Sequence, residues 1–306
     1  MRPLRRLYVE LHAGDRARRV EHRLLRRPRR PALSGKLKES TLPYQIIVCG
    51  GLAPDPLQTL EPVPGAASPG LKNEMMLPGV LDPWASHALY EAANLAKQHP
   101  GSTVRLVSLA PKAKLQQVLM TVAQKLPFEL MALDGANNGF SDANETGKAL
   151  GEAIAKLDPP MENLLVFGGW ESATRGSGAV MQIVAERLGI ADVFLAVDEI
   201  KVEEGGSFLV KERVEGGKHM VSRCSAPPAV LAWATGNLAE PPNHPQTGMA
   251  NMRVIMPSLQ KATPTAVGSG MSFASASLPK QVRETRIVKD TSAAEIAREI
   301  AEWLKQ

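Results

Sequence analysis

The chain has 306 residues and a formal net charge of +5, and 44% of its residues are hydrophobic. This length suits one large domain or two small ones. No apolar run approaches the roughly 20 residues of a membrane span, so membrane insertion is not expected. The two cysteines, Cys49 and Cys224, are far apart and have no metal-ligand spacing. They argue against a disulfide framework and favour a reducing compartment.

The positive charge is concentrated at one end of the chain. Residues 1–43 hold 13 of the 36 basic residues and four of the 31 acidic ones, which leaves 23 basic and 27 acidic residues in the rest. The body is therefore mildly acidic, and its charge gives no argument for a nucleic-acid partner.

Residues 1–43 lack the apolar region of a secretory signal, and we predict a basic, disordered extension. Their arginine content also fits a mitochondrial transit peptide, which would place the protein in the matrix. Glu10, Asp15 and Glu21 and the scarcity of serine weaken that alternative. Without a transit peptide, the expected location is the bacterial cytoplasm.

From Tyr44 onward, apolar runs of strand length alternate with segments of helical apolar spacing. Residues 52–72 interrupt this alternation and are rich in Pro and Gly, which predicts a long loop or a hairpin. Strands are expected at 45–49, 103–109, 128–133, 163–167 and 191–197, and helices at 84–98, 114–125, 142–157 and 179–188. Such alternation indicates βαβ units and an α/β fold with a parallel sheet. The loops after the strands then meet at one edge of the sheet.

The pattern changes after residue 197. Residues 200–202, 208–214 and 219–223 alternate across Gly-Gly pairs and predict antiparallel hairpins, and 229–235 predicts another strand. Residues 241–280 show little periodicity, so we expect an irregular, extended segment there. A final amphipathic helix is predicted for 291–305, capped by Thr291 or Ser292 with Glu295 completing a capping box. A helix after a loose segment suggests docking on another chain.

The stretch from Asn163 to Gly178 is the strongest indication of a binding site. An apolar strand ends at Gly168-Gly169, a loop of small and hydroxyl residues follows, and a helix begins near Ala179. Backbone N–H groups, hydroxyls and a helix N-terminus suit a phosphate, and ligands of open α/β sheets bind beyond the strand ends. A plain βα turn needs the same glycines, so the loop alone leaves both readings open.

Several short motifs follow one another from Tyr44 to the end of the chain, and none is specific alone. They are Val48-Cys49-Gly50 with Asp55 beyond it, Leu81-Asp82-Pro83-Trp84, Val107 to Pro111, Lys211 to Gly217, Ala226 to Leu231 and Asn237 to Pro241. In this order and spacing they resemble the β subunit of electron transfer flavoproteins, the FixA-like family.

The resemblance implies an αβ heterodimer that carries electrons from flavin-containing dehydrogenases to an acceptor such as a quinone oxidoreductase. The redox-active FAD is then held mainly by the α subunit. The β subunit has a Rossmann-like core, similar to that of adenine-nucleotide α-hydrolases, and binds AMP in most members or a second FAD in electron-bifurcating ones. In this scheme residues 44–235 form the nucleotide-binding core, and residues 236–306 form an extended arm that binds the α subunit and redox partners.

The resemblance and the glycine loop together assign the cofactor contacts. These are Cys49, Asp82, Trp84, Leu109, Gly168, Gly169, Ser172, Thr174, Arg175, Ser177 and Gly178. The loop is shorter than the family's AMP loop and lacks its Asp and Gln residues, and Asp82 stands where the family has Asn. AMP is still the expected ligand, with a second FAD or an empty site as alternatives.

Met249 and Met252 lie in the segment expected to reach a redox partner, and methionine suits adaptable binding surfaces. We predict that Met249 is the apolar anchor. The histidines share no metal-ligand spacing, and no nucleophile or acid–base pair is evident, so no metal and no catalytic residue are assigned. The chain is expected to be a carrier subunit in which the chemistry belongs to the flavin. An enzyme that uses an adenine nucleotide on the same fold is the rival interpretation.

Overall fold

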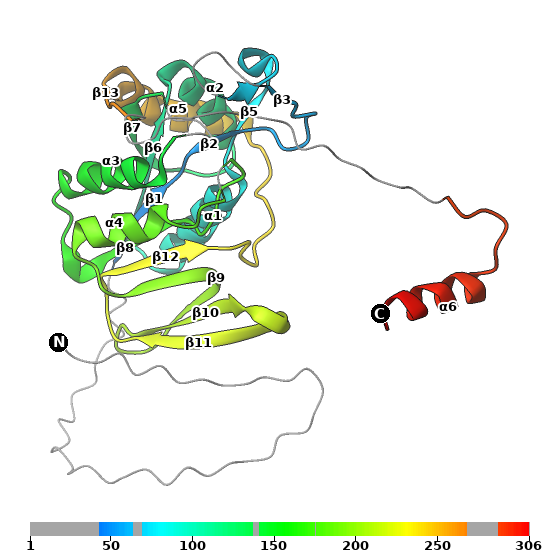
Figure 1. Cartoon of the computed structure of the whole chain (residues 1–306). Coiled ribbons are helices and arrows are strands. Elements are labelled where there is room, and N and C mark those ends of the chain that lie inside the picture. Colours follow the sequence, from blue (N-terminus) through cyan, green and yellow to red (C-terminus); the bar gives the residue numbers. More distant parts are fainter. Residues whose placement is uncertain (1–42, 64–68, 137–140, 175, 268–286, 306) are drawn as a thin grey trace, which may run out of the picture.

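A nine-stranded sheet organises the computed structural model, which describes residues 43–63, 69–136, 141–174, 176–267 and 287–305. Figure 1 shows the strands in the order β11-β10-β9-β12-β8-β1-β6-β7-β13. Their bounds are β1 Gln45–Cys49, β6 Thr103–Ala110, β7 Glu129–Asp134, β8 Leu164–Gly169, β9 Val193–Val202, β10 Phe208–Val214, β11 Lys218–Cys224, β12 Ala229–Trp233 and β13 Thr263–Pro264. All neighbours from β9 to β13 pair in parallel, and β9, β10 and β11 pair antiparallel. The predicted α/β class, with a mostly parallel sheet and antiparallel additions, is confirmed.

Helices cover both faces of the sheet (Figure 1). α1 Pro83–Gln98, α2 Lys112–Val122 and α5 Pro245–Gln260 pack on one face, and α3 Ala143–Ala155 and α4 Val180–Leu188 pack on the other. Short 3-10 helices lie at Glu74–Met76, Met161–Asn163 and Glu215–Gly217. The first four predicted helices are therefore present within a few residues of their expected ends.

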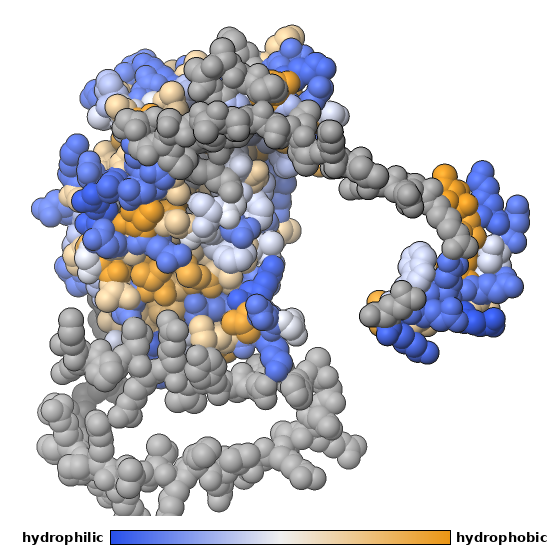
Figure 2. All heavy atoms as spheres, viewed as in Figure 1, coloured by the Kyte–Doolittle hydropathy of each residue, from blue (hydrophilic) through white to orange (hydrophobic). Residues whose placement is uncertain are grey.

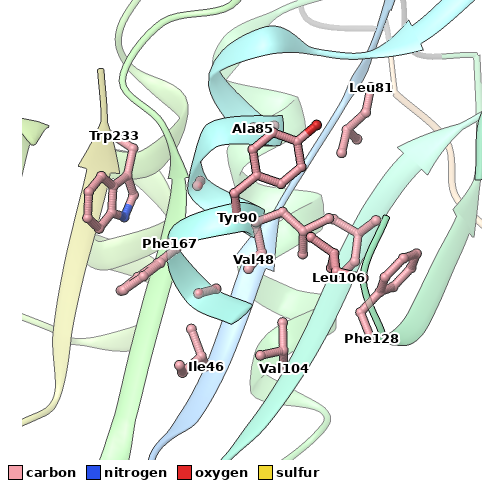
Figure 3. Packing of buried hydrophobic residues seen from close by; sticks show 14 of the residues in the cluster. Ile46, Val48, Leu81, Ala85, Tyr90, Val104, Leu106, Phe128, Phe167 and Trp233 are labelled. Atoms are coloured by element: carbon pink, nitrogen blue, oxygen red, sulfur yellow. The ribbon is translucent and has the colours of Figure 1, made fainter. Parts of the chain in front are cut away.

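The central strands are apolar along their whole length because both of their faces are buried. In β1, Ile46 and Val48 belong to one core, whereas Ile47 and Cys49 belong to the other. This explains why the strand reads as a continuous apolar run and not as an alternating one. Figure 3 shows the first core, where the Phe167 and Trp233 rings lie 5.3 Å apart on adjacent strands.

One end of the sheet is antiparallel, as the paired glycines predict. The residues expected to form two elements, 191–197 and 200–202, make one continuous strand, β9, which is a correction to the sequence prediction. At this end the guanidinium of Arg213 donates to Asp198 at 2.8 Å, and His219 Nε2 lies 3.0 Å from the same carboxylate. These contacts tie the hairpin to β9.

The Pro- and Gly-rich stretch after β1 forms two small antiparallel ladders. β2 Leu52–Pro54 pairs with β5 Gly79–Leu81, and β3 Pro62–Val63 pairs with β4 Gly70–Leu71. The sequence predicts either a long loop or a hairpin for residues 52–72, and the described residues of this stretch form a hairpin. The β2–β5 ladder brings the end of β1 next to the start of α1.

The expectation of an irregular segment at 241–280 is wrong for its first part, which forms the helix α5. Its buried residues Ile255 and Leu259 belong to the core on this face of the sheet, and Gly248 lies against Gln124. The side-chain amide of Asn251 donates to the carbonyl oxygens of Ala123 and Leu126 at 2.7 and 3.1 Å. The two prolines within this helix conceal it, because one occupies its first position and the other its last turn. Tertiary packing therefore outweighs weak helical propensity here. Residues 268–280 lie outside the described part of the chain.

The last helix, α6 Ala293–Trp303, has the predicted capping box: Ser292 Oγ accepts from the N–H of Glu295, whose carboxylate accepts from the N–H of Ser292. None of its residues is buried. Figure 2 shows hydrophobic side chains along one side of this helix and hydrophilic ones along the other. Its exposed apolar residues are Ile296, Ile300, Trp303 and Leu304. No helix in the described residues is both long and apolar enough to cross a membrane.

Candidate functional site

A cavity of about 720 Å³, counted to its open mouth, lies where β1, β6 and β8 end. Most of this volume is open to solvent, and the enclosed space is about 70 Å³, which is smaller than a typical small-molecule site. We call it the edge cavity. It is lined by Cys49, Gly50, Gly51, Leu52, Asp82, Ala85, Leu109, Thr146, Leu150, Gly169, Trp170, Glu171, Ser172, Thr174, Ser177, Gly178, Ala179, Val180 and Met181. The carboxyl edge of a parallel sheet is the expected position for a ligand in this fold class.

The paired glycines of β8 are required by close packing. A Cβ on Gly168 would overlap the Met181 sulfur of α4, and a Cβ on Gly169 would lie 2.6 Å from the Trp84 Cβ of α1. Both helices therefore approach the end of this strand closely. Gly168 lies behind the cavity wall, and Gly169 forms part of the wall.

The loop after β8 presents hydroxyl groups to the cavity. Ser172 Oγ and Thr174 Oγ1 are 3.1 Å apart, and the Gly176 N–H donates to the Ser172 carbonyl at 3.1 Å. Gly176 and Gly178 have φ angles of +59° and +62°, which only glycine adopts without strain. They turn the chain into α4. Arg175, predicted as a phosphate partner, lies outside the described residues.

The start of α4 faces the cavity. Ala179 precedes the helix without a side-chain cap, and Ala179, Val180 and Met181 line the wall. The first N–H groups of a helix carry partial positive charge and attract anions. Together with the hydroxyls of the loop, they provide donors for one phosphate group.

Asp82 is buried, with 4% of its surface exposed. Its Oδ1 accepts from the Trp84 N–H at 3.1 Å, and its Oδ2 accepts from the Ala173 N–H at 2.8 Å. It therefore caps α1 and also holds the loop after β8. Trp84 is half-buried against Gly169 and does not line the cavity.

The opposite wall is apolar and uncharged. Cys49 ends β1, and burial raises the pKa of its thiol to about 12, so it is neutral near pH 7. Leu109 from β6 and Leu150 from α3 continue this wall. Of the described lining residues, only Asp82 and Glu171 are acidic side chains, and none carries a positive charge.

Most of the predicted site residues therefore come together. Cys49, Asp82, Leu109, Gly169, Ser172, Thr174, Ser177 and Gly178 share one cavity. Sequence reasoning missed Thr146 and Leu150 of α3, because nothing in the pattern of that helix distinguishes its cavity-facing residues from its core residues. It also missed the bond from Ala173 to Asp82, which joins residues 91 positions apart.

The predicted partner residues lie elsewhere, on α5. Met249 is 65% exposed, whereas Met252 is half-buried and packs against the core. Within the described residues, no group of three or more His, Cys, Asp or Glu side chains is placed to hold a metal ion.

The edge cavity combines hydroxyl-bearing side chains and a helix N-terminus with an apolar wall, at the carboxyl edge of the parallel sheet. The electron transfer flavoprotein domain model matches residues 73–259. The chain belongs to this family, whose members are electron carriers. No curated protein matches the sequence.

Proposed function

We propose that this chain is the β-type subunit of a heterodimeric electron transfer flavoprotein. It would carry electrons from flavin-containing dehydrogenases to an acceptor such as a quinone oxidoreductase. The observation that carries the proposal is the edge cavity, whose hydroxyl loop and uncapped α4 start suit one phosphate group. FAD, held mainly by the α subunit, supplies the redox chemistry when it is bound.

The ligand that we assign to the edge cavity is AMP. Its phosphate would be held by the Ser172, Thr174 and Ser177 hydroxyls and by the N–H groups at the start of α4. Its adenosine would lie toward the apolar side formed by Cys49, Leu52 and Leu109.

Two exposed surfaces are assigned to protein partners. The apolar face of α6, with Ile300 and Trp303 at its centre, is proposed to dock on the α subunit. Met249 projects from a helix that is itself firmly packed, and is proposed to anchor the dehydrogenase. Half-buried Met252 supports that surface from below.

Co-expression of the chain with an α-type subunit tests this proposal. We expect a yellow heterodimer that releases one FAD and one AMP on denaturation, measured by absorbance and chromatography. Two FAD per heterodimer would identify a second flavin in place of AMP, and FAD alone would identify an empty edge cavity. Failure to form a flavin-containing heterodimer, or turnover of an adenine nucleotide by the chain alone, would contradict the proposed role.

A further inference from the structure

Asp82 connects three separate segments of the cavity wall. Its backbone N–H donates to the Gly51 carbonyl at 2.9 Å, next to the end of β1. Its two carboxylate oxygens accept from the Trp84 N–H at the start of α1 and from the Ala173 N–H in the loop after β8. A helix cap needs only the Trp84 bond, so the Ala173 bond calls for a separate explanation.

The chemistry of these bonds explains why a carboxylate occupies position 82. The Trp84 and Ala173 partners are both N–H donors, and an ionised Asp is the short side chain that offers two acceptor oxygens. Asparagine caps a helix about as well as aspartate does. Its amide group, however, would bring a second donor against the Ala173 N–H. The Ala173 bond therefore distinguishes Asp from Asn at this position.

The Ala173 bond also fixes the groups that face the ligand. Ala173 lies between Ser172 and Thr174, whose hydroxyls are 3.1 Å apart and line the edge cavity. Ala173 and Thr174 also line a second cavity, which is bounded by β2, β5 and α2. The loop is thus a partition between two cavities, and the bond from Asp82 holds this partition in place.

We propose that Asp82 is a positioning residue that clamps the loop after β8, so that the Ser172 and Thr174 hydroxyls are directed into the edge cavity. The clamp and its effect on the loop follow from the contacts themselves. Its effect on ligand affinity rests on the proposed nucleotide function. Loss of the clamp would let the loop shift toward the second cavity and would weaken phosphate binding, while α1 keeps its cap.

Asp82→Asn is the decisive variant, and Asp142→Asn is its matched control. Asp142 caps α3 with the same geometry, its Oδ1 accepting from the Asn144 N–H at 3.1 Å. Both variants keep a competent cap, but only Asp82→Asn loses an acceptor for a distant loop. Asp82→Ala is the third variant, because it removes the cap and the clamp together.

Amide hydrogen exchange on the full chain tests the clamp without any ligand. In Asp82→Asn we expect exchange at Ala173 to be about tenfold faster or more, as for the loss of a hydrogen bond to a charged group, with the first turn of α1 unchanged. Asp142→Asn should leave Ala173 unchanged. Asp82→Ala should accelerate exchange both in the loop and in the first turn of α1. If Ala173 exchanges equally in Asp82→Asn and wild type, Asp82 is only a helix cap and the clamp is refuted.

Titration of AMP into the flavin-loaded heterodimer tests the consequence for binding. We expect about tenfold weaker AMP binding in Asp82→Asn and unchanged affinity in Asp142→Asn. Faster loop exchange with unchanged AMP affinity would refute the positioning role. If wild type binds no AMP but the loop of Asp82→Asn exchanges faster, the clamp stands and the nucleotide assignment of the preceding section fails.

Discussion

The edge cavity and the helix α6 differ in how much of their apolar surface this chain covers by itself. Around the cavity, Gly168 and Gly169 allow α4 and α1 to close onto the end of β8, and Asp82 bonds the loop in place. On α6, Trp303 is 62% exposed and no residue is buried. The first region is completed by contacts within the chain, whereas the second presents an apolar surface that the described residues leave uncovered.

This difference separates the roles of the two regions. Substitutions at the cavity should alter the stability of the chain and the binding of a small ligand. Substitutions on α6 should alter assembly and leave the body unaffected. α5 combines both characters, since its inner face is packed and its outer face carries Met249.

The largest effect is expected on α6. Trp303→Ala removes the largest exposed apolar side chain of the helix, and buried interface Trp residues contribute about 2 kcal/mol or more to binding. We expect the affinity for the α subunit to fall at least about thirtyfold, measured by analytical ultracentrifugation. The midpoint of urea unfolding of the isolated chain should not change.

Arg298→Ala is the control for this prediction, because Arg298 lies on the opposite side of α6 from the apolar residues. It should assemble nearly as well as wild type. If Trp303→Ala assembles normally, α6 does not contact the α subunit, and the contrast between the two regions loses its functional meaning.

The next effect is expected at the cavity wall. A Cβ at Gly169 would lie 2.6 Å from the Trp84 Cβ and 2.7 Å from the Glu171 carbonyl oxygen, and overpacking of this kind costs about 1–3 kcal/mol. Gly169→Ala should therefore lower the free energy of unfolding by that amount, measured by urea denaturation.

Gly51→Ala is the matched control, because Gly51 lines the same cavity but an added Cβ would meet no atom within 4 Å. Its stability should stay within about 0.5 kcal/mol of wild type, as for substitutions without new contacts. Equal losses in the two variants would show that the close approach of α1 is not what requires glycine.

The third effect tests α5, where a packed helix carries an exposed residue. Met249→Ala should slow flavin reduction by the partner dehydrogenase several-fold. The reason is that an anchor residue contributes more to binding than the roughly 1 kcal/mol or less of a peripheral contact. Flavin content and heterodimer formation should remain unchanged. Stopped-flow absorbance measures the reduction rate. Met161→Ala is the control, because it alters another partly exposed methionine, located before β8, and it should not change the reduction rate. If Met249→Ala also leaves the rate unchanged, Met249 is not part of the partner surface.

The two regions also differ in how far the sequence predicts them. The strands and the glycine loop are predictable because apolar runs and Gly pairs act locally, and Cys49, Leu109 and Gly169 follow once the sheet is parallel. The bond from Ala173 to Asp82 is not predictable, because it depends on the path of a loop relative to a distant helix. α5 escapes prediction because its helix is held by packing and by the Asn251 contacts, and its prolines suggest an irregular segment.

The smallest effect concerns the contact between α1 and the turn after β12, where the chain leaves the sheet. Glu91 of α1 lies beneath the turn that leaves β12, where its Oε1 accepts from the Asn237 N–H at 3.1 Å. Burial raises the pKa of Glu91 above its ordinary value of 4.5, although hydrogen bonds from Asn237 and Leu238 oppose this shift. A raised folded-state pKa means that the folded chain binds a proton at Glu91 more readily than the unfolded chain does. The stabilisation that protonated Glu91 gives is therefore complete below pH 4.5 and is lost as the pH rises through the folded-state pKa.

Glu91→Gln is uncharged, as the protonated form is, and keeps an oxygen for the Asn237 N–H, although its amide group gives up the weaker contribution of the Leu238 N–H. We therefore expect a small gain in stability at pH 7 that disappears as the pH falls to about 4.5, measured by thermal unfolding across this range. Glu152→Gln, at an exposed position on α3, should show no such pH dependence. A loss of stability at pH 7 in Glu91→Gln would give the opposite result. It would mean that the hydrogen bonds from the turn after β12 stabilise the ionised carboxylate by more than its burial destabilises it.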